Sequence, residues 1–215
     1  DIEGIARPVS SWIKTSKSSK EIGMDAAEAI KAASKKPGEI ATLILPGDTA
    51  WNEGSKIDEV ILQNNPKKVP TDLVKEALSK IEKANNPLLL VGGSALEENN
   101  LIKIALIAEK LGCELKTDWF NARLDKGAGR INSIRIPYVV DKAVEALKNF
   151  DTIITIGARQ PVAFFAYPNK PGILTQDKTN FIDLAGLSDD ITSLINEFSD
   201  LANVTSKNPK TISEF

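Results

Sequence analysis

Stretches of apolar residues alternate with amphipathic stretches along most of the chain. Residues 88–91 are all Leu or Val, as in a strand that is buried on both faces of a parallel sheet. Apolar positions at helical spacing follow this run and predict amphipathic helices. Strands that alternate with helices predict an α/β fold, a Rossmann-like parallel sheet with helices on both faces. The expected strands are 87–91, 113–117, 152–156 and two segments around Ile173-Leu174 and Phe181-Ile182. Four helices are expected: one that begins at a Thr71-Asp72 cap, one from about 95 to 111 with Gly112 as its C-cap, one over 139–147 and one over 191–201.

The first fifty residues carry a pattern of their own. Trp12–Thr15 and Ile40–Leu45 predict two strands, and the helix between them is expected to begin after a Ser18 or Ser19 cap. One β-α-β unit buries too little surface to be a domain, so we expect a fragment of a longer polypeptide. The polar stretch that follows contains two prolines and predicts an interdomain linker, pinned to a neighbour by Val60-Ile61-Leu62. The expected divisions are 1–50 for the β-α-β unit, 51–70 for the linker, 71–205 for the second domain and 206–215 for a tail or linker.

Three clusters of glycine, aromatic and charged residues follow expected strands. They are Gly92-Gly93-Ser94, the segment from Trp119 to Gly129, and Gly157-Ala158-Arg159. Because ligands bind beyond the carboxyl ends of strands in such sheets, we predict a site at this edge. The paired glycines bring backbone N–H groups to the start of the next helix, where an anion such as phosphate is favoured. The alternative is a plain strand-to-helix turn with nothing bound, since neither GxGxxG nor GxxxxGK[ST] occurs.

The composition narrows the possible chemistry. The chain contains no histidine, which excludes Ser-His and Cys-His nucleophile pairs and makes a stand-alone enzyme improbable. A net charge of -2 gives no basic footprint, so neither nucleic acid nor a membrane is an expected partner. No apolar run is long enough to span a bilayer. The single cysteine, Cys113, excludes an internal disulfide and is expected to be a buried small hydrophobe, and we expect a cytoplasmic location.

Four segments, taken together and in order, resemble the acetolactate synthase-like large subunits of the thiamine-diphosphate-dependent enzymes. They are ATLILPGDTAW (41–51), LLLVGGSAL (88–96), FNARLDKGAG (120–129) and IGARQPVAFFAYPNKPG (156–172). By this resemblance, residues 1–50 match the last part of the pyrimidine-binding domain. Residues 71–205 match the central domain, whose sheet in the family is Rossmann-like and six-stranded. The resemblance implies a transferase or decarboxylase as the parent enzyme, homo-oligomeric at full length, in which this domain bridges two cofactor-binding domains and is inactive alone.

The resemblance also states which cofactors are implied and where. Thiamine diphosphate and Mg²⁺ serve the parent enzyme, but their motifs lie outside this chain, because no GDG occurs here and Pro46-Gly47-Asp48-Thr49 only ends a strand. No catalytic residue and no metal ligand is therefore expected in the chain. In the family the central domain holds FAD, ADP or nothing, so a nucleotide-binding module is the alternative interpretation. The residues that would face such a nucleotide are Gly92, Gly93, Ser94, Gly157, Ala158 and Arg159.

Some side chains near the predicted edge have two interpretations each. The segment Gln160–Phe165 is more apolar than the family's charged stretch at that place, which argues against FAD. Arg159 pairs either with a phosphate or with a carboxylate such as Asp183. The aromatic residues are expected to gather at this edge and either line an interface to other domains or stack on a ring. Those aromatic residues are Trp119, Phe120, Phe164, Phe165 and Tyr167. The cationic side chains of the loop, Arg123, Lys126 and Arg130, are either solvated or contact a phosphate or an acidic substrate.

Overall fold

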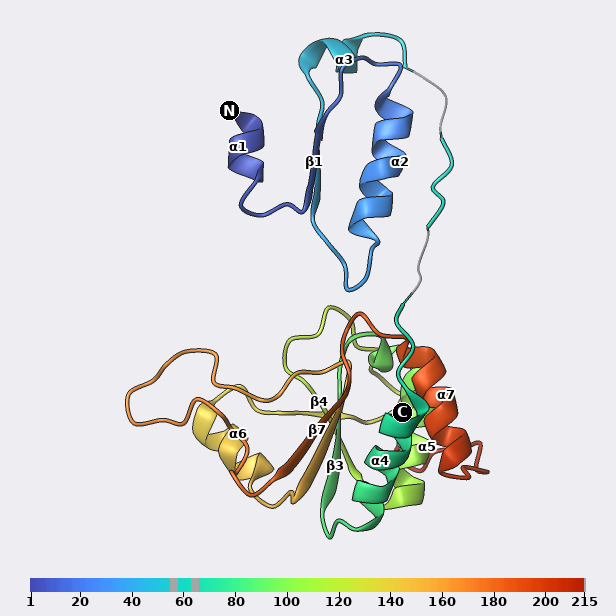
Figure 1. The fold of residues 1–215 in the computed structure, drawn as a ribbon, viewed down its shortest axis with the longest axis vertical. Coiled ribbons are helices and arrows are strands. Elements are labelled where there is room, and N and C mark those ends of the chain that lie inside the picture. Colours follow the sequence, from blue (N-terminus) through green and yellow to red (C-terminus); the bar gives the residue numbers. More distant parts are fainter. Residues whose placement is uncertain (55–57, 63–65, 215) are drawn as a thin grey trace. The chain divides into compact units, whose positions relative to one another are not determined.

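The computed structural model describes residues 1–54, 58–62 and 66–214 and divides the chain into two compact units (Figure 1). We call Asp1–Pro66 the N-terminal unit and Lys67–Phe215 the C-terminal unit. No described helix is both long enough and apolar enough to cross a membrane.

The N-terminal unit is a β-α-β arrangement with a short helix at each end. Its strands pair in parallel, with Trp12 opposite Ala41. The Ser18 or Ser19 cap was a wrong prediction: the helix begins after Glu21, which makes no capping bond. The first helix was not expected; the Asp1 carboxylate caps it by accepting from the Gly4 N–H at 2.8 Å. The elements are α1 (Ile2–Ala6), β1 (Trp12–Thr15), α2 (Ile22–Ala33), β2 (Ala41–Ile44) and α3 (Gly47–Trp51).

A polar cluster, not an apolar core, lies at the centre of the N-terminal unit. Asp25 on α2 is fully buried and accepts a hydrogen bond from the buried Ser16 hydroxyl at 2.6 Å. The Lys14 ammonium lies 2.8 Å from Asp25 and 2.9 Å from the carboxylate of Glu28. The bonds from Lys14 and Ser16 hold the pKa of Asp25 below its ordinary value, and the bonds to Asp25 and Glu28 raise that of Lys14. The strands beside this cluster are only half-buried.

The C-terminal unit is built on a five-stranded parallel sheet in the order β5-β4-β3-β6-β7. From the middle strand β3 the chain first adds β4 and β5 on one side and then β6 and β7 on the other, which is the strand order of a Rossmann fold. The predicted fold class is confirmed, with five described strands where the resemblance implied six. The strands are β3 (Pro87–Val91), β4 (Glu114–Thr117), β5 (Ile134–Arg135), β6 (Thr152–Ile156) and β7 (Asn180–Ala185).

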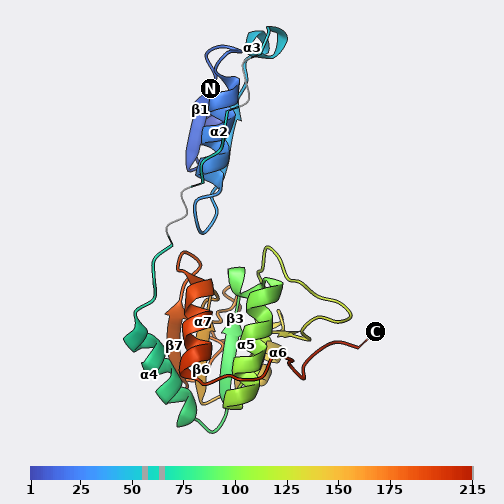
Figure 2. The same ribbon diagram turned by 90° about the vertical axis from the view of Figure 1, so that its right-hand side faces the viewer.

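Helices cover both faces of this sheet, as Figures 1 and 2 show. Alternate residues of β3 point to opposite faces, so Leu89 and Val91 pack under three of the helices while Leu88 and Leu90 pack under the fourth. Burial on both faces explains why this strand is apolar throughout. The first face carries α4 (Thr71–Glu82), α5 (Glu98–Leu111) and α7 (Ile191–Leu201), the other carries α6 (Val140–Leu147), and a short 3₁₀ turn, η1 (Gly93–Leu96), precedes α5.

Several sequence expectations differ from the structure of the C-terminal unit. The cap expected at Thr71-Asp72 is wrong, because Pro70 occupies the N-cap position of α4 and makes no side-chain bond. The strand expected around Ile173-Leu174 is also absent from the sheet: Ile173 makes only one isolated antiparallel bridge, to Val162. Gly112 is confirmed as the C-cap of α5, with φ of 69°. Cys113 is half-buried against the core, and burial raises the pKa of its thiol to about 12.

Candidate functional site

The three predicted clusters lie at one edge of the five-stranded sheet, because β3, β4 and β6 are neighbours and run in parallel. Gly92 follows β3, Asp118 follows β4 and Gly157 follows β6. The two windings of the sheet separate between β3 and β6, and ligands of Rossmann-like folds bind at this switch point. The site prediction therefore rests on Gly92 and Gly157, which flank this point.

Gly92 and Gly157 meet each other directly. A Cβ added at Gly157 would lie 2.4 Å from the Gly92 carbonyl oxygen, and one added at Gly92 would lie 2.5 Å from the Gly157 carbonyl oxygen. Their N–H groups are already bonded, that of Gly92 to Ile156 O at 3.0 Å and that of Gly157 to Ala185 O at 2.7 Å. This close packing of two strand ends accounts for both glycines without a ligand.

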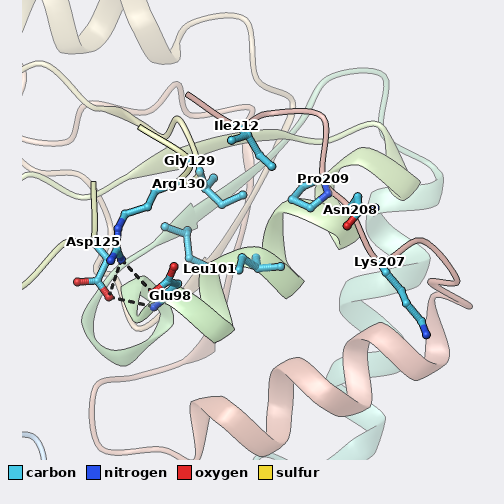
Figure 3. A pocket seen from close by; sticks show the side chains of 11 residues that line it. Glu98, Leu101, Asp125, Gly129, Arg130, Lys207, Asn208, Pro209 and Ile212 are labelled. Atoms are coloured by element: carbon cyan, nitrogen blue, oxygen red, sulfur yellow. Dashed lines mark hydrogen bonds and ion pairs between the residues drawn. The ribbon is translucent and has the colours of Figure 1, made fainter. Parts of the chain in front are cut away.

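The start of α5 holds an anion that the protein itself supplies. Helix α5 begins at Glu98, after the turn η1, and the Asp125 carboxylate accepts from the Glu98 N–H at 3.1 Å. A hydrogen bond from Arg123 at 3.1 Å holds the pKa of Asp125 below its ordinary value, and the guanidinium of Arg130 lies 3.8 Å away. Figure 3 shows Arg130 turned towards Asp125 and Glu98. A phosphate at the Glu98 N–H would have to displace the Asp125 carboxylate.

Arg159 acts on a different carboxylate from the one considered from the sequence. Asp183 on β7 accepts from the Thr155 hydroxyl at 2.9 Å, and no described ion pair joins it to Arg159. The charge of Arg159 acts on Asp118, at the end of β4. Burial raises the pKa of Asp118, although the N–H of Trp119 at 2.7 Å and the N–H and charge of Arg159 oppose that shift. The Asp118–Arg159 contact thus ties the ends of β4 and β6 together.

The segment 207–213, within the predicted tail or linker 206–215, lies across α5 and the loop 129–132. We call it the strap. Ile212 forms an antiparallel bridge with Ile131, and the N–H of Ser213 donates to Arg130 O at 2.8 Å. Beneath the strap is a cavity of about 160 Å³, with the ion pairs of Arg130 at one end and Lys207 at the other (Figure 3). Apolar side chains of Leu101, Ile102, Ile131, Pro209 and Ile212 line most of the rest.

Glu109 on α5 holds the strap in place. Its carboxylate accepts from the N–H of Lys210 at 2.7 Å, the N–H of Thr211 at 3.1 Å and the hydroxyl of Thr211 at 2.8 Å. Burial alone would raise the pKa of Glu109, but these bonds outweigh burial and keep the pKa below its ordinary value. The ionised Glu109 thus attaches the strap to α5, in addition to the backbone bonds that join the strap to the loop 129–132.

A comparison with curated proteins finds a relative that matches most of this chain. The chain is 32% identical over 174 residues to a Mycobacterium tuberculosis (strain ATCC 25618 / H37Rv) protein named "Putative acetolactate synthase large subunit IlvX". The alignment covers 81% of this chain and 33% of that protein. The chain is related to the acetolactate synthase-like large subunits. The predicted resemblance is thereby confirmed, and no family model matches the chain.

Solved structures of thiamine-diphosphate-dependent enzymes share the fold of this acetolactate synthase-like chain. One is the 4-hydroxybenzoylformate decarboxylase of Rhodococcus jostii RHA1, with a TM-score of 0.66 and 15% identity. The match covers 100% of this chain and 43% of the decarboxylase chain. Another is the benzoylformate decarboxylase of Polynucleobacter necessarius, with a TM-score of 0.63 and 18% identity, which matches 99% of this chain and 43% of its own. The chain thus spans a third of its curated relative and less than half of these neighbours.

Two residues of this acetolactate synthase-like chain that shape the region were not anticipated from the sequence. Glu109 lies within a helix, and no sequence signal links it to Thr211, more than one hundred residues later. Tyr138 precedes α6, and its ring lies 5.8 Å from that of Trp119. Its aromatic character was the only available signal, since the loop around it has no recognisable spacing.

Replacing Glu109 with Ala is expected to loosen the strap at Lys210 and Thr211, because the three hydrogen bonds to the Glu109 carboxylate lose their acceptor together. Trypsin should then cleave after Lys207 and Lys210 at least several-fold faster, since cleavage needs a locally open backbone. Mass spectrometry of timed digests measures this rate. The matched control is Glu97→Ala, an exposed residue at the start of α5 whose side chain makes no capping bond. Equal cleavage rates in both variants would show that Glu109 does not hold the strap.

Proposed function

We propose that this chain is a structural part of a thiamine-diphosphate-dependent, acetolactate synthase-like enzyme. In this proposal the C-terminal unit is the central domain that bridges the two cofactor-binding domains, and the chain is not catalytic by itself. The main support for this proposal is that groups of the protein itself fill the switch point: Gly92 and Gly157 pack on each other, and the Asp125 carboxylate accepts from the N–H at the start of α5. A Rossmann-like domain whose usual ligand position is filled by its own groups serves to hold other parts in place.

The N-terminal unit supports the same proposal. Its two-stranded sheet, in the described part of the chain, has no further strand on either side, and so small a sheet gives the unit little stability of its own. Large apolar side chains are left in solvent, with Trp51 90% and Ile5 80% exposed. Such a surface fits a unit that packs against other domains of the same polypeptide, which would complete a pyrimidine-binding domain.

The cofactor chemistry of such an enzyme would be supplied outside the described residues. Thiamine diphosphate, when bound in an enzyme of this class, stabilises the carbanion, and the protein binds and orients it. The described residues contain no group of three or more Asp, Glu or Cys side chains that could hold a metal ion. In this proposal the role of the chain itself is to position other parts of the enzyme. We also propose that the full-length enzyme is a homo-oligomer. The alternative, a module that binds FAD or ADP, is not supported by the geometry at α5.

Turnover and nucleotide titration test the proposal with the chain as it stands. With thiamine diphosphate and Mg²⁺ added, we expect no release of CO₂ from pyruvate or benzoylformate above the protein-free rate. Isothermal titration with ADP and with FAD should give no heat of binding for either nucleotide. Measurable turnover would overturn the non-catalytic role, and saturable binding of ADP or FAD would overturn the purely structural one.

A further inference from the structure

The cavity beneath the strap is enclosed by three segments that are far apart in the sequence (Figure 3). Helix α5 contributes Leu101 and Ile102, the loop after β4 contributes Ile131, and the strap contributes Pro209 and Ile212. Leu101 and Ile131 are only 1% and 3% exposed, so they form fixed walls within the core of the unit. Ile212 lies on the strap and is 43% exposed. The cavity therefore has a rigid apolar floor and an outer side that the strap covers.

The charged groups at the ends of the cavity do not favour an ion inside it. The Arg130 guanidinium lies 3.1 Å from the carboxylate of Glu98 and 3.8 Å from that of Asp125. Asp125 also pairs with Arg123 at 3.1 Å, so two carboxylates and two guanidinium groups balance at this end. At the other end, Figure 3 shows the side chain of Lys207 pointing away from the other labelled side chains. An ion in the cavity would lose its water and meet groups that are already paired, which favours a neutral ligand.

The volume of the cavity sets the size of such a ligand. An apolar cavity of about 150 Å³, engineered into another protein and lined by similar side chains, stays dry and binds benzene. The cavity beneath the strap measures about 160 Å³ and so has room for a molecule of about six to eight non-hydrogen atoms. Atoms that line a cavity lack van der Waals contacts on one side, and a molecule that fits restores them. Size and lining thus point to one ring or one branched hydrocarbon group.

We propose that the cavity beneath the strap is a binding site for a small, neutral, apolar molecule of benzene size. The lining residues do not include Gly92 or Gly157, so the site is separate from the contact between these two glycines at the switch point. A bound molecule contacts α5 on one side and the strap on the other. The inference rests on the volume, lining and charges of the cavity and does not depend on the proposed function.

Binding at this site also stabilises the strap in its closed position. The strap is attached to α5 by Glu109 and to the loop 129–132 by backbone bonds, among them that from the N–H of Asn132 to Thr211 O at 2.8 Å. These few bonds lie near the chain surface, where local opening costs less than global unfolding. A ligand that binds only beneath the closed strap lowers the population of the open form by mass action. The rate of cleavage within the strap therefore reports binding.

Titration of the whole chain with benzene, followed by methyl NMR spectra, tests this inference. The ring current of bound benzene should shift the methyl signals of Leu101, Ile131 and Ile212, which line the cavity. We expect saturation with a dissociation constant of about 0.1 to 1 mM, within the range for a ligand of six non-hydrogen atoms. At ten times this constant, tryptic cleavage after Lys207 and Lys210 should slow about tenfold.

One substitution fills the cavity and another serves as its control. Ile102→Phe places a larger side chain against the cavity and should weaken benzene binding at least about tenfold. The matched control is Leu78→Phe, because Leu78 on α4 is also half-buried against the same core but does not line the cavity. It should leave the dissociation constant unchanged. Circular dichroism checks the fold of both variants, and Ile212→Trp, at the more exposed strap position, is a second way to fill the cavity.

Three results would overturn the inference. The first is the absence of saturable shifts at the methyl groups that line the cavity, up to the solubility limit of benzene. The second is binding that is undiminished in folded Ile102→Phe and Ile212→Trp or lost in folded Leu78→Phe, because either result places the site elsewhere. The third is binding of benzoate at least as tight as that of benzene, which would contradict a neutral ligand.

Discussion

Replacing Gly157 with Ala is expected to destabilise the C-terminal unit by about 3 to 5 kcal/mol, the range of the most damaging single substitutions. The new Cβ would lie 2.4 Å from the Gly92 carbonyl oxygen and 2.7 Å from Cδ1 of Ile191. The oxygen cannot retreat freely, because it accepts from the Ala95 N–H at 3.1 Å. The φ of +65° at Gly157 adds strain for any residue with a side chain. Urea unfolding followed by circular dichroism measures the loss.

Gly172→Ala is the matched control for this substitution. Gly172 lies in the same unit, in the segment between β6 and β7, and a Cβ added there would meet no heavy atom within 4 Å. Its effect on the free energy of unfolding should stay within about 0.5 kcal/mol. If Gly157→Ala behaved like Gly172→Ala, the ends of β3 and β6 would not be packed as described. The switch point would then have room for a ligand, and the structural role proposed for this domain would lose its main support.

Replacing Asp25 with Ala is expected to lower the free energy of unfolding of the N-terminal unit by about 3 kcal/mol. This is the lower end of the range for breaking a buried ion pair, because Lys14 is partly exposed. The change leaves the buried Ser16 hydroxyl without its acceptor and Lys14 without its nearest carboxylate. A unit with two strands has little stability in reserve, so residues 1–66 should lose their cooperative unfolding transition. The fluorescence of Trp12, on β1, follows this transition.

Glu28→Ala is the matched control, because Glu28 is the other carboxylate bound to Lys14 but its side chain is 47% exposed. Exposed pairs contribute little, so the N-terminal unit of this variant should still unfold cooperatively. A collapse of the unit in Glu28→Ala, or an intact unit in Asp25→Ala, would contradict the central role given to Asp25.

The same cluster makes the stability of the N-terminal unit depend on pH. The folded-state pKa of Asp25 lies below its ordinary value of 3.8, so its contribution is complete above that value. The contribution is lost as the pH falls from about 4 through the lower folded-state pKa. Lys14, whose pKa is raised, keeps its contribution below its ordinary value of 10.5 and loses it only in strong alkali. Urea unfolding at a series of pH values, followed by the fluorescence of Trp12, measures this loss of stability in acid.

The secondary structure of the C-terminal unit could be predicted well wherever burial imposes a pattern. The buried strands β3 and β6 have the predicted bounds, because both of their faces lie under helices. Elements with little buried surface escaped prediction. Strand β5 has two exposed residues, and α1 has five residues with only Ala6 buried. Helix starts were also misplaced, since Ser18, Ser19 and Thr71 look like caps but lie outside the cap positions.

The sequence by itself determined the fold class and the edge at which the three clusters meet. Both follow from local patterns, since parallel strands bring their carboxyl ends to one side whatever the details of packing. Only the tertiary structure decided what occupies that edge. Gly92 and Gly157 are distant in sequence yet in contact, and Asp125 reaches the start of α5 from a later loop. The rings of Trp119, Tyr138 and Phe164 likewise come together from three loops. Contacts between distant segments depend on how the sheet is wound, and no local spacing encodes them.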